Sequence, residues 1–129
     1  MRLNPTKITH YWRAAGWFGV GLIIYLSLTP SPPQINIDNG DKLGHFAAYG
    51  LVTLWFAQLY TGLRQRIGLV IGMVGLGIAM EYAQGTTDYR SFEVADMVAD
   101  AIGACLGWIA APPRLPSLLS WAKKHLSKC

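Results

Sequence analysis

Four long apolar runs divide the chain, and short polar segments rich in proline, glycine and charge separate them. The runs occupy approximately residues 12–29, 43–62, 66–84 and 93–111. Each is close to the roughly 20 residues that a helix needs to cross the hydrocarbon core of a bilayer, since a helix rises about 1.5 Å per residue. We therefore predict an all-α, polytopic membrane protein with four transmembrane helices packed in a bundle.

Prolines and a capping residue mark the ends of the predicted helices. Pro30, Pro32 and Pro33 end the first run, because proline lacks an amide proton and cannot continue a helix. Pro112 stops the fourth run in the same way. Asp41 precedes the second run, and we expect it to be the N-cap of that helix, with its carboxylate accepting a backbone hydrogen bond.

The first run has a second interpretation, as a cleaved signal peptide. A basic start followed by an apolar middle fits that interpretation. No Ala-x-Ala cleavage site follows the run, however, and three more apolar runs do. Tyr11, Trp12 and Trp17 lie near its start, where aromatic residues commonly mark a membrane interface. We therefore expect this run to be a transmembrane helix.

The last residues, 112–129, form a basic tail, which we assign to the same single membrane domain, 1–129. A helix here would place its apolar and basic side chains on different faces. The apolar face would hold Leu115, Leu118, Leu119, Ala122 and Leu126, and the basic residues would be Lys123, Lys124 and Lys128. This pattern is typical of a helix that lies in the membrane surface. A disordered tail is the alternative.

The composition also indicates a membrane protein. Hydrophobic residues make up 52% of the chain and charged residues 14%. A soluble domain usually carries about 25% charged residues. The deficit indicates that lipid is the solvent for much of the surface.

Lysine and arginine are concentrated beside the apolar runs. Nine of them are Arg2, Lys7, Arg13, Arg64, Arg66, Arg114, Lys123, Lys124 and Lys128. If every run crosses the membrane, these residues all lie on one side, which the positive-inside rule makes cytoplasmic. Both termini are then cytoplasmic. The basic residues behind the net charge of +4 lie beside the apolar runs and do not form one binding patch. We therefore expect no nucleic-acid partner.

The acidic residues all fall on the opposite side of the predicted membrane. They are Asp38, Asp41, Glu81, Asp88, Glu93, Asp96 and Asp100. Acids contribute little to topology, so their position needs another explanation. Counting about 1.5 Å per residue places polar groups from three helices in the same outer third of the membrane. Because ionisable residues at such depths usually serve a function, we predict an outward-facing polar cleft.

The candidate cleft residues come from the last three runs, the two residues before the second run and the loop between the third and fourth. They are Asp41, Lys42, His45, Tyr49, Glu81, Gln84, Arg90, Asp96 and Asp100. Asp41, His45 and Tyr49 are four residues apart and share one helix face. We expect the acids to face one another, with Lys42, His45 and Arg90 as their partners.

Each candidate also has a purely structural interpretation. His45 can be a hydrogen-bonded residue between helices, and Tyr49 an interfacial aromatic. Arg90 can pair with a neighbouring acid of its loop. Asp96 and Asp100 lie one turn apart and would repel each other when ionised, so they share a proton, hold a cation or meet Arg90.

Several classes of chemistry lack their usual motif. No Gly-x-Ser-x-Gly surrounds a serine nucleophile, no glycine-rich loop is present for phosphate, and no His-Glu-x-x-His spacing is present for a metal. We therefore expect no metal and no other cofactor. The acids and His45 nevertheless offer enough oxygen and nitrogen ligands to leave a metal as the alternative.

Small residues at helical spacing indicate how the helices pack. Gly72 belongs to a series of glycines in the third run, and Gly103 and Gly107 form a Gly-x-x-x-Gly motif in the fourth. Small residues let membrane helices approach closely, because packing rather than hydrophobicity draws helices together in lipid. We expect these glycines to lie at helix contacts, within the chain or in an oligomer.

Taken together, these motifs resemble the VanZ-like family of small bacterial membrane proteins. The motifs are Asp41-Lys42-x-x-His45-Phe46-x-x-Tyr49, Glu81-x-x-Gln84, Arg90 with Asp96, and Gly103 before Gly107. The resemblance covers residues 30–108. Its founding member is associated with resistance to the glycopeptide teicoplanin. This chain departs from the family at Asp100, where asparagine is usual.

The resemblance implies a four-helix protein of the bacterial inner membrane, with its motif residues toward the outer face. Our first hypothesis is a non-enzymatic protein of the cell envelope whose cleft binds a membrane lipid or a lipid-linked cell-wall precursor and affects glycopeptide sensitivity. The alternative is an intramembrane enzyme acting on a lipid head group, with Glu81 or Asp96 as general base and His45 or Arg90 stabilising charge. A structural or transport subunit is the third hypothesis.

Overall fold

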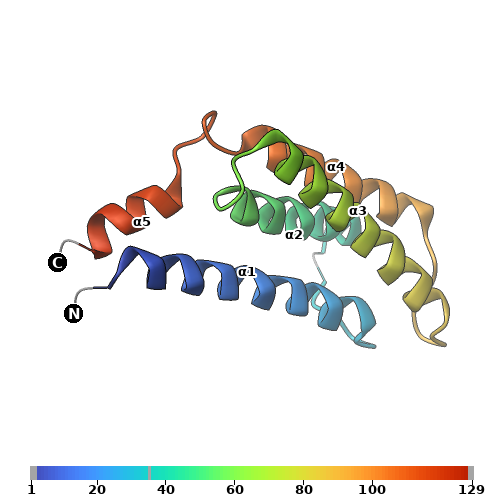
Figure 1. Ribbon diagram of the computed structural model, residues 1–129. Coiled ribbons are helices and arrows are strands. Elements are labelled where there is room, and N and C mark those ends of the chain that lie inside the picture. The colour runs from blue at the N-terminus through green and yellow to red at the C-terminus, as the bar shows by residue number, and fades with distance from the viewer. Residues whose placement is uncertain (1–2, 35, 128–129) are drawn as a thin grey trace.

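The computed structural model describes residues 3–34 and 36–127 and consists of five helices (Figure 1). They are α1 (Pro5–Leu28), α2 (Gly40–Ala57), α3 (Leu63–Gly85), α4 (Val94–Ala110) and α5 (Leu118–Leu126). The described residues contain no strand, so the all-α prediction is confirmed for this part of the chain. Arg2, Lys128 and Cys129 lie outside it.

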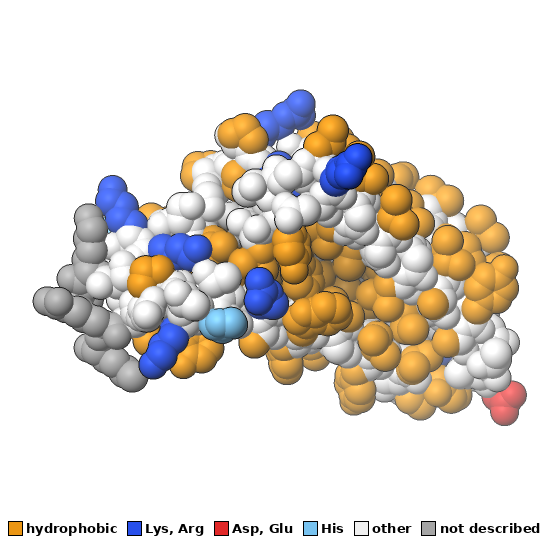
Figure 2. Space-filling model, viewed as in Figure 1, with side chains coloured by type: hydrophobic (Ala, Val, Ile, Leu, Met, Phe, Trp, Pro, Cys, Tyr) orange, Lys and Arg blue, Asp and Glu red, His pale blue; other side chains and the backbone are white. Residues whose placement is uncertain are grey.

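The helices α2, α3 and α4 pack on one another, and α1 lies along them (Figure 1). The loops after α1 and α3 meet at one end of the bundle. The loop between α2 and α3 and both described ends of the chain lie at the other end. Basic side chains gather at the end that holds α5, whereas apolar side chains cover much of the remaining surface in this view (Figure 2).

Two helix starts differ from the sequence predictions. α1 begins at Pro5 rather than near residue 12, because proline is well suited to a first turn and the Asn4 side chain accepts a hydrogen bond from the Thr6 amide. α2 begins at Gly40, so Asp41 is in its first turn and is not the N-cap. The capping position belongs to Asn39, which has a left-handed backbone with φ 57°.

The second helix also ends earlier than predicted, at Ala57 rather than Gly62. The last carbonyl groups of a helix have no partner within it, and Arg66 supplies one here. Its guanidinium donates to the carbonyl oxygens of Ala57 (3.1 Å) and Tyr60 (2.9 Å). The buried arginine is therefore a helix cap as well as a positive charge beside an apolar run.

The closest helix contact joins α2 and α4 through glycines. A Cβ atom on Gly103 would collide with the backbone carbonyl of Phe46, and one on Gly107 would lie 2.5 Å from the Gly50 oxygen. Gly72, predicted to pack against another helix, instead has open space where a side chain would begin. In α3 it is Gly77 that faces α4, where an added Cβ would lie 2.8 Å from Asp100 Oδ2.

Two tryptophans join α1 to α2 at the end of the bundle opposite the acidic side chains. The rings of Trp12 and Trp55 stack with centroids 3.7 Å apart and planes 4° from parallel. Each indole N–H donates to the backbone carbonyl of the other residue, at 3.0 and 2.8 Å. The pair thus contributes packing and satisfies four polar groups at once.

The tail residues include a helix, α5, that packs on the start of α1. Leu119 and Ala122 of α5 are buried against Ile8 of α1. Its amphipathic character agrees with the predicted pattern, and its location in a membrane surface stays a prediction.

One helix in the described part of the chain, α3, is long and apolar enough to cross a membrane. Only 22% of its most apolar stretch is buried within the fold, so most of that stretch faces outward. The prediction of four membrane-crossing helices is therefore not confirmed.

Candidate functional site

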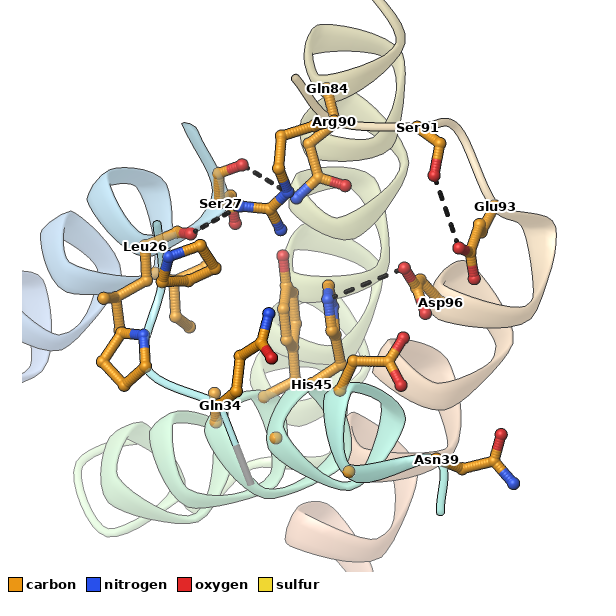
Figure 3. Close-up of a pocket in the computed structure, with 18 of the residues that line it drawn as sticks. Leu26, Ser27, Gln34, Asn39, His45, Gln84, Arg90, Ser91, Glu93 and Asp96 are labelled. Carbon is orange, nitrogen blue, oxygen red and sulfur yellow. Dashed lines mark hydrogen bonds and ion pairs between the residues drawn. The ribbon is translucent and has the colours of Figure 1, made fainter. Parts of the chain in front are cut away.

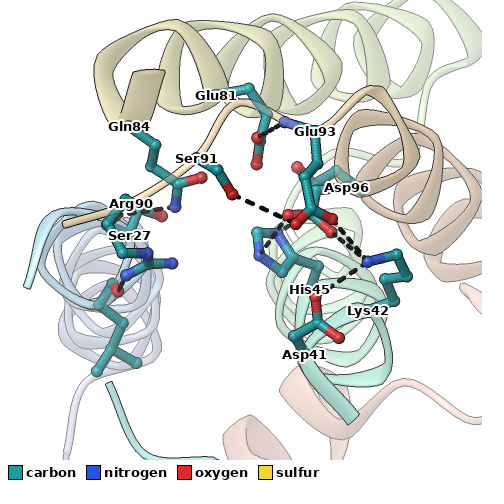
Figure 4. A network of polar contacts seen from close by, with 12 residues as sticks. Ser27, Asp41, Lys42, His45, Glu81, Gln84, Arg90, Ser91, Glu93 and Asp96 are labelled. Carbon is teal, nitrogen blue, oxygen red and sulfur yellow. Dashed lines mark hydrogen bonds and ion pairs between the residues drawn. The ribbon is translucent and has the colours of Figure 1, made fainter. Parts of the chain in front are cut away.

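Charged and polar side chains from α2, α3, α4 and the segment before α4 converge at one end of the bundle (Figure 4). α2 and α4 bring their first turns to this end, and α3 brings its last turns. This arrangement follows from the antiparallel order of the helices, which places the two starts beside the α3 end. Acids that are distant in the sequence thereby become neighbours.

Lys42 joins three carboxylates at the outer edge of this cluster. Its ammonium nitrogen lies 3.0 Å from Asp41, 2.8 Å from Glu93 and 3.4 Å from Asp96. Asp41 and Lys42 precede the apolar run 43–62. The hydrogen bond from Lys42 lowers the pKa of Asp41, and the hydrogen bonds to Glu93 and Asp41 raise the pKa of Lys42.

His45 lies deeper and connects α2 to two aspartates of α4. Its Nδ1 atom is 2.9 Å from Asp100 Oδ1, and its Nε2 atom is 3.8 Å from Asp96 Oδ2. Asp100 is 1% exposed. Because an ionised carboxylate only accepts hydrogen bonds, Nδ1 is the donor in the shorter contact. A neutral His45 ring therefore presents the lone pair of Nε2 toward Asp96.

Glu81 and Tyr49 carry polar atoms that are buried without a hydrogen-bond partner. Glu81 is 0% exposed; its Oε2 accepts from the Glu93 backbone amide at 3.1 Å, and its Oε1 has no partner. Tyr49 is 2% exposed, and its hydroxyl has no partner. Leaving such a group unpaired costs roughly 1–3 kcal/mol, so these two atoms mark the places where a ligand would be stabilised.

Gln84 and Arg90 contact the end of α1 instead of the acids. Gln84 Nε2 donates to the Ser27 carbonyl at 2.8 Å, and Arg90 donates to the carbonyls of Leu26 (3.2 Å) and Thr29 (3.0 Å). The partnership predicted between Arg90 and the acids is therefore wrong. The physical reason is that a helix end presents unpaired carbonyl groups, which a guanidinium satisfies well.

Tyr89 completes this cap by donating from its hydroxyl to the Leu28 carbonyl at 2.8 Å. Four consecutive carbonyl groups, three at the end of α1 and that of Thr29 just after it, thus receive hydrogen bonds from side chains near the α3 end. Tyr89 was not among the predicted site residues, and no spacing in the sequence would identify it. Glu93 was not among them either, although an acid just before a helix start was a usable signal.

A cavity of about 620 Å³ opens between the end of α1 and the starts of α2 and α4 (Figure 3). Its apolar lining includes Ile23, Leu26 and Ala48, and its polar lining includes His45 and Asp96. Arg90 and Gln84 also line the cavity while capping α1. The space therefore joins an apolar surface to a polar one.

Two groups of side chains have the geometry of metal ligands. One comprises Asp41, Glu93 and Asp96, and the other comprises His45, Glu81 and Asp96. In each group one ligand atom from every residue lies within 4.8 Å of the others. The ammonium of Lys42 already lies among the three acids of the first group.

The fold and the site define a small all-helical protein whose titratable groups converge from three helices near one end of the bundle. The chain belongs to the VanZ/LLP1 family, whose model matches residues 1–118. The resemblance found in the sequence is thereby confirmed. Family membership suggests a membrane protein, and the apolar helix α3 agrees with this.

The chain is also similar to an uncharacterised protein of Schizosaccharomyces pombe. The two are 36% identical over 95 residues, which cover 69% of this chain and 56% of the yeast protein. The chain thus spans about half the length of this curated relative. No solved structure matches the chain.

Proposed function

We propose that this protein is a multi-pass protein of the cell envelope whose cavity binds the polar head group of a membrane lipid. The observation that carries the proposal is the cavity of about 620 Å³, whose lining combines apolar residues of α1 and α2 with polar residues of α2 and α4. A lipid presents the same combination, because its head group is polar and the start of its acyl chains is apolar.

The outer surface of the bundle supports insertion in a membrane. Large apolar side chains on each of the first four helices are exposed, among them Leu22, Leu51, Ile71 and Ile102. An apolar surface of this extent in water marks an interaction surface. We infer that α1–α4 all cross the bilayer, with both termini cytoplasmic and the cavity toward the outer face, in the inner membrane if the source is bacterial.

The charges around the cavity favour a zwitterionic head group that carries an amine. Asp41, Glu93 and Asp96 lie on one side of the space, and Arg90 lies on another (Figure 4). A head-group ammonium complements the carboxylates, and its phosphate complements the arginine. Glycerophospholipids occur in bacterial and yeast membranes alike, so phosphatidylethanolamine is the first lipid to test.

Lipid binding is tested by replacing a glycine that lines the cavity with a large side chain that fills it. Gly44 lines the cavity and has open space where a side chain would begin, so Gly44→Trp places an indole in the cavity. Gly75→Trp is the matched control, because Gly75 also has open space but lies on the exposed face of α3. Binding is measured in nanodiscs with phosphatidylethanolamine, phosphatidylglycerol and a lipid-linked cell-wall precursor.

Wild-type protein and Gly75→Trp should bind phosphatidylethanolamine at least tenfold more tightly than phosphatidylglycerol, and Gly44→Trp should lose that preference. Tighter binding of the cell-wall precursor would identify that precursor, and not a phospholipid, as the ligand of the same cavity. Equal binding by both tryptophan variants would contradict the site itself. An effect on teicoplanin sensitivity, measured as growth inhibition of bacteria with and without the gene, belongs to the precursor outcome.

A second candidate, head-group hydrolysis or transfer, is favoured by the unpaired Oε1 of buried Glu81. Such an atom beside His45 and Asp96 is suited to accept a proton from a reacting group. Purified protein should then convert a labelled phospholipid, and Glu81→Ala should abolish the conversion. Inactivity of the wild-type protein toward a panel of phospholipids and lipid-linked precursors would reject this candidate.

A further inference from the structure

Three side chains from three helices meet where the sequence shows no metal motif. His45 comes from α2, Glu81 from α3 and Asp96 from α4. One ligand atom from each lies within 4.8 Å of the other two, and His45 Nε2 is 3.8 Å from Asp96 Oδ2. The ligands are far apart in the chain, which is why no short spacing predicted them.

The contact between His45 and Asp100 has the form found behind many metal-bound histidines. A metal-binding imidazole usually donates its second N–H to a carboxylate, which fixes the tautomer and the direction of the ring. Here Asp100 Oδ1 lies 2.9 Å from Nδ1 and is almost completely buried. That contact leaves Nε2, the atom nearer Asp96, free to bind a cation.

The burial of Glu81 supplies an independent observation. Its Oε1 atom has no hydrogen-bond partner although the residue is 0% exposed, and Figure 4 shows the carboxylate directed toward His45 and Asp96. A buried carboxylate oxygen without a hydrogen-bond donor destabilises the fold unless a cation or a proton binds to it. The unpaired hydroxyl of Tyr49 also lies on this side of α2, where it lines the cavity.

The neighbouring acidic group provides a useful contrast. Asp41, Glu93 and Asp96 already share the ammonium of Lys42, at 3.0, 2.8 and 3.4 Å. A resident cation therefore already lies among these acids and offsets part of their negative charge. No lysine or arginine in the described part of the chain forms an ion pair with Glu81 or Asp100.

We propose that His45, Glu81 and Asp96 bind one divalent transition-metal ion, with Zn²⁺ as the best-matched ion and Asp100 as the residue that positions His45. One imidazole and two carboxylates suit zinc or manganese, whereas magnesium and calcium prefer oxygen ligands alone. In a tetrahedral zinc site with bonds of about 2.0–2.2 Å, two ligand atoms lie about 3.3–3.6 Å apart. Ligand atoms that are within 4.8 Å of one another therefore need to move together by up to about 1.5 Å when the ion binds.

Three protein ligands leave at least one coordination position for another molecule. Zinc sites of this kind, unlike closed four-ligand structural sites, hold a water or a substrate atom in the open position. His45 and Asp96 both line the cavity, so the open position faces it. A lipid phosphate or a water molecule is the ligand this position would take. The metal site itself depends only on the triad and stands whether or not the cavity binds lipid.

The experiment measures binding of Zn²⁺ alone to chelator-treated protein in detergent, by isothermal titration calorimetry. Wild-type protein and Asp88→Asn, which alters an exposed loop acid, should each bind one ion per chain with the same affinity. Glu81→Gln and Asp96→Asn should bind at least 100-fold more weakly. Asp100→Asn keeps an acceptor for His45 and should weaken binding about 10- to 100-fold.

A second measurement does not depend on the folding of those variants. The chain has three histidines, so a protein carrying His10→Asn and His125→Asn retains His45 alone. Saturating Zn²⁺ should shift the ¹⁵N resonance of Nε2 and leave Nδ1 protonated. An unshifted Nε2, an absence of binding by the wild-type protein, or wild-type affinity in Glu81→Gln would each overturn the proposal.

Discussion

His45 of α2 and Asp100 of α4 lie 2.9 Å apart, Nδ1 to Oδ1, beside the closest approach of their two helices. The contact joins a half-buried imidazole to an almost completely buried carboxylate. It is therefore part of the α2–α4 interface as well as of the polar cluster. Substitutions at Asp100 should report on both properties.

Asp100→Leu should lower the free energy of unfolding by about 1.5–3 kcal/mol, because it removes a hydrogen bond to a charged group and leaves Nδ1 unpaired. Asp100→Asn keeps an oxygen acceptor at the same position and should lose less than half as much. Denaturant titration in mild detergent, followed by circular dichroism, measures the difference. Equal losses in the two variants would show that the hydrogen bond contributes nothing to stability.

Gly103→Ala should destabilise the fold through the α2–α4 contact. An added Cβ would collide with the carbonyl of Phe46 on the facing helix, and overpacking of this kind typically costs about 1–3 kcal/mol. Gly72→Ala is the matched control, since Gly72 faces open space. Alanine favours a helix over glycine by up to about 1 kcal/mol, so the control should be neutral or stabilising by thermal unfolding.

Arg90→Ala should loosen the end of α1 without unfolding the bundle. The carbonyls of Leu26 and Thr29 lose their donor, so the last turn of α1 should open more often. Hydrogen exchange of the Thr29 amide, which bonds to the Tyr25 carbonyl at 2.9 Å, should speed up about tenfold. Arg114→Ala removes an exposed arginine at the other end of the molecule and should leave that rate unchanged.

The proposed topology is open to a labelling test with single cysteines. In a protein whose own cysteines are replaced, Asp88→Cys should react with a membrane-impermeant maleimide in intact cells, because the proposed topology places the loop after α3 outside. Arg64→Cys, in the loop between α2 and α3, should react only after the cells are opened. The reverse pattern would turn the proposed cavity toward the cytoplasm, and labelling of both positions in intact cells would exclude a membrane-crossing α3.

The positions of α2, α3 and α4 could be predicted because apolar runs and breaking residues act locally. Pro30 and Pro112 cannot continue a helix that precedes them, because proline lacks an amide proton. The start of α1 was set too late because a polar first turn looks like a loop when only hydrophobicity is followed. Asn4 and Pro5 carried the missing signal.

The contacts within the site were less predictable because they join residues that are distant in the sequence. Gln84 caps a carbonyl 57 residues earlier, and Arg90 caps two more at and just beyond the end of the same helix. A sequence pattern can predict how deep in the membrane a charged residue lies. It does not predict which neighbouring helix end supplies the hydrogen-bond partner of that residue. Arg90 was therefore assigned to the acids, whereas in the structure it donates to carbonyl groups at the end of α1.

The parallel indoles of Trp12 and Trp55 provide a spectroscopic signal for the contact between α1 and α2. Two chromophores 3.7 Å apart couple their electronic transitions and should produce a paired positive and negative band in the circular dichroism spectrum. The signal would vanish when α1 separates from α2 and would persist while they stay together. Opening of this helix by lipid, metal or detergent can thus be followed without attaching a dye to the protein.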